Sequence, residues 1–386
     1  MLLPINSITL SIAVTVLAIH DIRCVDHYSF YNERKRRLEL LDVLEMAGVE
    51  VEALSSNTEI DGKKISKGSP IISLAQPYGM FAKAMLEKGG YPNLLDEKGE
   101  PIRPYDVTAH SLSQLMGVEA IPISRNINTM DFRRRFEIVA TIDASPFNDG
   151  IYRSYIPSKD EGWTRWIVLE KASRLDIGSW NYTEIKNKYI NDGDFSGLGS
   201  ITFPDQSASQ ILNGYREGRM PKEYTGGLKG KGVENLKKFV ENGGTLVFMN
   251  RSSDFAIEQF NLPVKNISKG WKRKDFFIPG SILRTELDTS HPVANGMPEK
   301  SIAWFERSPV FESTDDSRVK VIGKYPSDPK EILLSGWALG KEKIAGKAAL
   351  VEVKMGKGKV ILFGFRPQYR GQSLATFPLL FNSIKN

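Results

Sequence analysis

The fold is decided by residues 245–253, which read Thr-Leu-Val-Phe-Met-Asn-Arg-Ser-Ser. The run from Thr245 to Met249 is almost wholly apolar, which is typical of a strand buried on both faces of a parallel sheet. Polar residues then interrupt the run, and Asp254 to Phe260 resumes with helical spacing. The stretch therefore predicts a buried strand, a sharp turn that begins at Asn250, and a helix.

The same unit occurs twice before this stretch. Strands are predicted over Ile151–Ile156 and Gly199–Phe203. Each is followed by a serine, Ser158 or Ser207, with Glu or Gln three residues later, and this spacing is typical of a helix start. Strands that alternate with helices in this way predict an α/β fold, with a mostly parallel sheet and helices on both faces.

The remainder of the chain departs from this alternation. At about residues 270–330 short apolar runs are separated by Pro and Gly, and we interpret this region as a β-rich antiparallel insertion. A hairpin of Ala348–Lys354 with Lys359–Phe365 is predicted next, and then a helix over Thr376–Ile384. Upstream, we predict a smaller α+β segment over residues 28–147, so that the α/β domain spans residues 148–386.

Residues 1–27 form an apolar N-terminal segment. Its apolar run, Ile8–Ile19, is too short to span a bilayer and has the length of a signal-peptide core. No Lys or Arg precedes the run, and no clean cleavage site follows it. The segment is therefore interpreted as a leader, a buried strand or the product of a mistaken start of the reading frame. An extracytoplasmic or secreted location is slightly favoured. No stable membrane span is predicted.

Composition excludes several kinds of site. The single cysteine, Cys24, excludes an internal disulfide framework and a multi-cysteine zinc site, and the four histidines form neither H-x-x-E nor H-x-x-x-H. The 52 Lys and Arg against 46 Asp and Glu give a net charge of +6, and no nucleic-acid-binding motif surrounds the basic runs. We therefore predict no metal site, no cofactor and no nucleic-acid partner.

The turn after the decisive strand is where an α/β enzyme usually presents its nucleophile. Here the leading residue is Asn250, which has no nucleophilic oxygen or sulfur, and the pattern G-x-S-x-G is absent. We interpret Ser252 and Ser253 as helix N-caps. The glycine-rich residues 225–232 lack the P-loop spacing and are interpreted as a flexible loop, with an anion site at the start of the following helix as the alternative.

The densest cluster of polar and aromatic side chains follows the first predicted strand of the sheet, at the edge where α/β proteins bind ligands. The candidates for ligand or partner contact in it are Asp160, Glu161, Trp163, Arg165 and Trp166. Asp160 and Glu161 are adjacent, so they do not face each other on a helix, and a catalytic carboxylate pair is not predicted. Helix capping and packing remain the alternative role of these residues.

Longer strings point to a family. They are Ala75-Gln76-Pro77-Tyr78, Tyr105-Asp106-Val107-Thr108-Ala109-His110, residues 160–166, Tyr224-Thr225-Gly226-Gly227, Leu334-Ser335-Gly336-Trp337, Ala345-Gly346-Lys347-Ala348-Ala349 and Phe363-Gly364-Phe365-Arg366-Pro367-Gln368. With them, residues 28–386 resemble the C-terminal half of bacterial zinc-carboxypeptidase-like proteins, where a class I glutamine amidotransferase-like domain follows a metallopeptidase domain. The resemblance implies that fold, adds Tyr224 to the candidate contacts, and leaves the peptidase domain without a counterpart.

The resemblance also implies a degenerate catalytic triad. Active relatives place cysteine where this chain has Asn250, and His-Pro-Glu where it has Arg366, Pro367 and Gln368. Without a thiolate or an imidazole, glutamine hydrolysis lacks its nucleophile and its base. We therefore expect no catalytic residues on this chain and no activity of its own.

Three hypotheses follow. The first is a non-catalytic accessory or binding module. The second is the docking half of a split zinc metallocarboxypeptidase, with the peptidase domain on a separate chain, hydrolysing C-terminal residues of peptides. The third is a small-molecule or glycan receptor that uses Trp163, Arg165 and Trp166. An adjacent reading frame encoding H-x-x-E would favour the second hypothesis over the first. A screen for ligand-induced thermal stabilisation would test the third.

Overall fold

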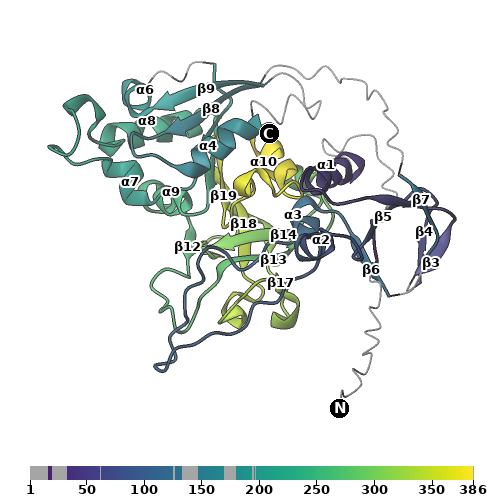
Figure 1. Ribbon diagram of the computed structural model, residues 1–386. Helices are drawn as coiled ribbons and strands as arrows, with labels where there is room; N and C mark the ends of the chain where they lie inside the picture. Colours follow the sequence, from purple (N-terminus) through teal and green to yellow (C-terminus); the bar gives the residue numbers. More distant parts are fainter. Residues whose placement is uncertain are drawn as a thin grey trace, which may run out of the picture.

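The computed structural model describes residues 16–19, 33–60, 62–124, 127–132, 147–168, 180–193, 195 and 197–385. Within these ranges the chain forms a large sheet, a smaller antiparallel sheet and a short hairpin, with helices packed around them (Figure 1). The two larger sheets hold different parts of the sequence, because the smaller one is built before residue 132 and the large one after residue 146.

The large sheet contains the predicted parallel core. Its neighbouring parallel strands are, in order, β9 (Trp180–Lys186), β8 (Phe147–Arg153), β10 (Ser200–Phe203), β11 (Thr245–Met249) and β19 (Gly358–Phe363). All five residues of β11 are buried, as the apolar run at its position predicts. The α/β fold class is confirmed.

An antiparallel extension continues this sheet beyond β19. It runs through β18 (Ala348–Met355), β16 (Val319–Lys324), β13 (Pro279–Leu287) and β14 (Lys300–Glu306). The short strands β12 (Val264–Asn266), β15 (Phe311–Ser313) and β17 (Leu333–Ser335) join its side. The predicted hairpin and β-rich insertion are therefore both present, and the insertion enlarges the main sheet instead of forming a separate one.

Helices cover both faces of the parallel core, and alternate residues of β11 show how. Leu246 and Phe248 belong to one hydrophobic cluster with residues of α7 (Ala208–Asn213), α8 (Lys229–Glu241) and α9 (Ser252–Phe260). Val247 and Met249 belong to another cluster, with Leu379 of α10 (Phe377–Lys385). The short α4 (Lys159–Trp166) packs against the turn at residues 369–371, and α6 (Asn187–Asp192) packs against α8 (Figure 1).

The N-terminal part has its own antiparallel sheet. Its strand order is β6 (Ala120–Ile123), β1 (Val16–Ile19), β5 (Pro70–Ser73), β2 (Glu52–Leu54) and β7 (Thr129–Asp131), with the hairpin of β3 (Thr58–Ile60) and β4 (Lys63–Ile65) nearby. The end of the apolar run at residues 8–19 thus lies in a strand, whereas residues 1–15 fall outside the described ranges. Export of the chain stays a prediction.

Three helices join this part to the rest of the molecule. They are α1 (Glu33–Met46), α2 (Gly79–Leu86) and α3 (Leu112–Met116). Leu41 and Leu86 share one buried cluster with Trp304 of β14 and Phe377 of α10. The change in sequence pattern near residue 147 is therefore not matched by a break in the core, and the division into domains stays a prediction.

None of the helices in the described part of the chain is both long and apolar enough to cross a lipid bilayer.

Candidate functional site

The backbone turns sharply between β11 and α9, at Asn250. This residue is fully buried and has a φ of +55°, in the left-handed region that few residues other than glycine and asparagine adopt. Its N–H donates to the carbonyl of Phe363 at the end of the neighbouring strand, over 2.8 Å. The turn thus has the strained geometry of a nucleophile elbow, with an amide side chain at the leading position.

The two serines after this turn do not cap the helix, so the N-cap prediction for them is wrong. The N-cap position is Arg251, which makes no side-chain cap hydrogen bond. Ser252 Oγ lies 2.9 Å from the carbonyl oxygen of Phe203, and Ser253 Oγ lies 3.3 Å from that of Phe363. Because both hydroxyls are fully buried, they need acceptors, and they find them at the ends of adjacent strands.

Asp205 follows β10 and lies at the centre of a group of charges beside the turn. It accepts hydrogen bonds from the backbone N–H and the guanidinium of Arg251, the shortest from Nη2 at 2.7 Å. Asn250 Nδ2 and Arg366 Nη2 each donate to it over 2.9 Å. A single carboxylate after β10 therefore fixes residues at the ends of two other strands, β11 and β19.

Arg366 follows β19 and is 3% exposed. Besides Asp205, its guanidinium lies 3.3 Å from a carboxylate oxygen of Asp160 and 3.3 Å from one of Glu306. Its Nη1 also donates to the Glu306 carbonyl over 2.8 Å. We call Asp160, Asp205, Asn250, Arg251, Glu306 and Arg366 the elbow cluster.

Ionisation in the elbow cluster follows from burial and pairing. Burial favours the neutral form of Asp205, but the hydrogen bonds from Arg251 and the charge of Arg366 outweigh it and lower the pKa of Asp205 to about 2. Burial dominates at Asp160 and raises its pKa, although Arg366 opposes the shift. At Arg366 burial is outweighed by the three carboxylates, so its pKa is raised and it stays charged.

Gln368, which the family resemblance places at another triad position, is fully buried, and its side chain reaches α4. Its Nε2 donates to Thr164 Oγ1 over 3.0 Å. Its Oε1, like Oδ1 of Asn250, is buried and has no hydrogen-bond partner within the described ranges. Neither amide can attack a carbonyl carbon, and a guanidinium that is always protonated cannot act as a base.

The predicted contact residues do not form one surface. Asp160 enters the elbow cluster, whereas Glu161 accepts from Arg165 Nε over 3.0 Å. Ser158 caps α4 as predicted, by accepting from the N–H of Glu161, but the Glu161 carboxylate does not reach back in return.

The aromatic candidates divide further. Trp163 and Trp166 meet edge to face at 5.9 Å and 83°, and a Cβ on Gly371 would lie 2.5 Å from the Trp166 ring. Tyr224 is 45% exposed and lies edge-on to Tyr155 at 5.5 Å. The two tryptophans therefore pack against the chain after β19 and do not make a flat stacking platform.

Sequence reasoning missed three members of the elbow cluster, namely Asp205, Arg251 and Glu306. Each follows the last buried residues of a predicted strand, at Phe203, Met249 and Phe305. Polar residues directly after buried strands were the available signal, because such strand ends meet at one edge of a sheet.

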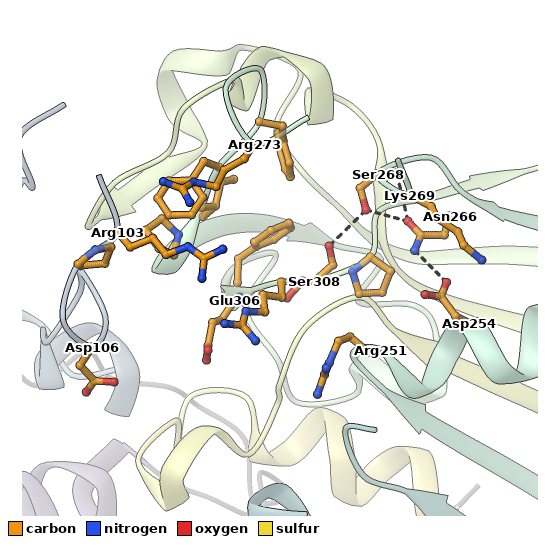
Figure 2. A pocket seen from close by; sticks show the side chains of 18 residues that line it. Arg103, Asp106, Arg251, Asp254, Asn266, Ser268, Lys269, Arg273, Glu306 and Ser308 are labelled. Carbon is orange, nitrogen blue, oxygen red and sulfur yellow. Dashed lines mark hydrogen bonds between the residues drawn. The ribbon is translucent and has the colours of Figure 1, made fainter. Parts of the chain in front are cut away.

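A cavity of about 660 Å³ opens beside the elbow cluster (Figure 2). Arg251 and Glu306 belong to both. The remaining lining comes from the loop before α3, from Asp254 of α9, from the end of β12 through the start of β13, and from the end of β14 and the residues after it. Its other arginines are Arg103, Arg273 and Arg307. We call this space the basic cavity. Within the described ranges, no three His, Cys, Asp or Glu side chains are grouped so that they could hold a metal ion.

Comparisons with known proteins give structural similarity only. No family model and no curated protein matches the chain. Solved structures do match: a cytoplasmic protein from Salmonella typhimurium LT2 has a TM-score of 0.40 at 13% identity, over 62% of this chain and 100% of that one. A ThuA-like protein from Bacteroides uniformis has a TM-score of 0.37 at 14% identity, over 64% and 94%.

A third similar structure is that of a GMP synthase subunit from Thermoplasma acidophilum. Its TM-score is 0.38 at 10% identity, over 62% of this chain and 92% of that one. At these scores and identities the similarities assign neither a family nor an activity. They also give no support to an association with zinc carboxypeptidases.

Proposed function

We propose that this chain is a catalytically silent α/β binding module. The observation that carries the proposal is the state of the elbow, where the side chain at the nucleophile position is an amide held by a carboxylate. Asn250 Nδ2 donates to Asp205 over 2.9 Å, and the residue is fully buried. A group that is neither nucleophilic nor accessible does not begin covalent catalysis.

The neighbouring position supports the same proposal. In an amidotransferase triad this side chain would accept a proton from the nucleophile, but Arg366 is charged and contacts three carboxylates. Its contacts stabilise the edge of the sheet and leave no lone pair for proton transfer. The elbow cluster therefore has a structural role in this proposal, and ligand or partner contact takes place next to it.

An activity assay tests the proposal. Purified protein is incubated with glutamine and with a panel of C-terminally unblocked peptides, and ammonia or amino-acid release is measured. We expect no turnover above buffer for the wild type, for Asn250→Ala, or for the exposed control Asn213→Ala. Turnover that Asn250→Ala abolishes and Asn213→Ala retains would contradict the proposal.

A narrower proposal concerns the partner. In it the module serves, as an accessory or docking half, a zinc metallocarboxypeptidase domain on a separate chain. It rests on the sequence strings alone. A neighbouring reading frame with H-x-x-E whose product co-purifies with this chain would favour it, and a product that fails to associate with it would contradict it.

A further inference from the structure

The basic cavity lies where three separate parts of the chain meet. Its outer wall is the loop before α3, which hydrogen bonds fix to later parts of the chain, among them the insertion. The guanidinium of Arg273 donates to the carbonyl of Pro101, and Trp337 Nε1 donates to Asn93 Oδ1 over 2.9 Å. Figure 2 shows Arg103 and Arg273 on one side of the cavity and Arg251 and Lys269 on the other. Hydrogen bonds between the loop before α3 and later parts of the chain thus hold the outer wall in place.

The positive charges of this cavity are only partly neutralised. Lys269 pairs with Glu258, and Arg251 pairs with Asp205. Among the residues that the structure describes, Arg103 and Arg307 have neither an ion-pair partner nor a hydrogen-bond partner for their guanidinium groups, and both are exposed. Nε of Arg273 is buried and also lacks a hydrogen-bond partner in the described part of the chain. The unsatisfied donors of the cavity are therefore cationic.

The acidic residues of the lining do not pair with these guanidinium groups. Asp106 is paired with Arg370 at 2.8 Å, and Glu306 with Arg366 at 3.3 Å. Asp254 accepts from Asn266 Nδ2 over 2.8 Å. Each carboxylate is thus engaged by a donor other than the free arginines.

An apolar wall faces the same space. Phe276 meets Phe305 edge to face at 5.8 Å, and Phe277 lies beneath the Arg273 guanidinium at 5.2 Å. A guanidinium over an aromatic ring is held in place while its remaining donors stay available. Arg307 adds a strained backbone, with a φ of +53°, in the segment directly after β14. Such strain collects at sites where a side chain must point in a set direction.

We propose that the basic cavity binds a small organic anion, a carboxylate or a phosphate joined to an aromatic or aliphatic body. Arg103 and Arg307 recognise the anionic group, and the phenylalanine wall holds the apolar body. A volume of about 660 Å³ lies within the range of small-molecule sites. Guanidinium groups suit carboxylate and phosphate equally, because both present two oxygens to the planar fork. This inference rests on the proposed binding role and names its ligand class.

The test uses fluorescent probes of that chemistry. The full chain is titrated with 2-naphthoate and with 2-naphthyl phosphate, and the neutral 2-naphthamide serves as the matched control. We expect saturable binding of both anions, weak binding of the amide, and weaker anion binding as salt is raised. The double variant Arg103→Gln, Arg307→Gln should bind the anions about tenfold more weakly. Arg219→Gln, which removes an exposed arginine outside the cavity, should bind them like the wild type.

Other outcomes overturn the inference. Binding of 2-naphthamide as tight as that of the anions would exclude recognition of charge. Failure of both anions to saturate below about 1 mM would exclude the site for this ligand class. Anion binding that survives the double variant would place the site elsewhere. These experiments measure binding and are independent of the turnover assay. If no anion binds, the proposal of catalytic silence still holds. If the turnover assay detects activity, the proposed anion site still holds.

Discussion

The elbow cluster and the basic cavity share Arg251 and Glu306, yet their charges are balanced in opposite ways. In the cluster Arg366 is 3% exposed and contacts three carboxylates, whereas in the cavity Arg103 and Arg307 are exposed and contact none within the described ranges. Charges that are buried must be paired, and charges that face water are free to bind. We therefore expect the buried Arg366 to stabilise the fold, and the exposed Arg103 and Arg307 to bind the anionic ligand.

The largest expected effect breaks the cluster at its centre. Asp205→Asn keeps the shape of the side chain but leaves Arg251 and Arg366 without their shared carboxylate. We expect the free energy of unfolding to fall by about 4 kcal/mol, because the change leaves Arg251 without its ion-pair partner and Arg366 without one of its three carboxylates. Urea unfolding at neutral pH measures this, with the exposed Asp316→Asn as the control. A loss below about 1 kcal/mol would show that the cluster does not stabilise the fold.

A second prediction concerns Asp149, a buried carboxylate. It is 5% exposed and accepts a hydrogen bond from Ser200 Oγ over 2.7 Å, and among the described residues its Oδ2 has no partner. Burial raises its pKa from 3.8 to about 6, against the opposing hydrogen bond of Ser200. The folded protein thus holds the proton more tightly than the unfolded chain does. Stability from this residue is fully present below about pH 4 and is lost as the pH rises through about 6.

Asp149→Asn removes this titration. The difference in unfolding free energy, variant minus wild type, should therefore increase by about 3 kcal/mol between pH 4 and pH 8. Urea unfolding at both pH values gives the difference, and any constant cost of the new amide cancels in the comparison. A difference that does not change with pH would show that Asp149 titrates normally in the folded protein.

The smallest expected effect is on the cavity side. Arg103→Gln with Arg307→Gln should change the free energy of unfolding by less than about 0.5 kcal/mol, because neither guanidinium has a partner to lose within the described ranges. The same urea series measures it. A loss comparable with that of Asp205→Asn would remove the distinction between the two groups of arginines.

The sequence predicts local structure well where the signal is itself local. The buried β11 and the Ser158 and Ser207 caps depend on residues within a few positions of one another, and each is found. The roles of Ser252 and Ser253 depend instead on the carbonyls of Phe203 and Phe363, which no nearby residue indicates.

The candidate site shows the same division. Asn250 and Arg366 could be singled out from their places in the chain, and the structure brings both to Asp205. Asp205 itself could not, because its importance arises only when the ends of β10, β11 and β19 lie side by side. The order of strands in a sheet is set by packing over the whole domain, which residue spacing does not encode.

The cluster that joins Leu41 and Leu86 to Trp304 and Phe377 sets a limit on how the molecule can be dissected. Val107 lies against Gly280, where an added Cβ would come within 2.6 Å of it, and Thr108 N–H donates to the Gly280 carbonyl over 3.0 Å. A fragment starting at residue 148 would expose this apolar seam and would lose the outer wall of the basic cavity. Expression trials that aim for the α/β half alone should therefore keep residues 33–132 attached.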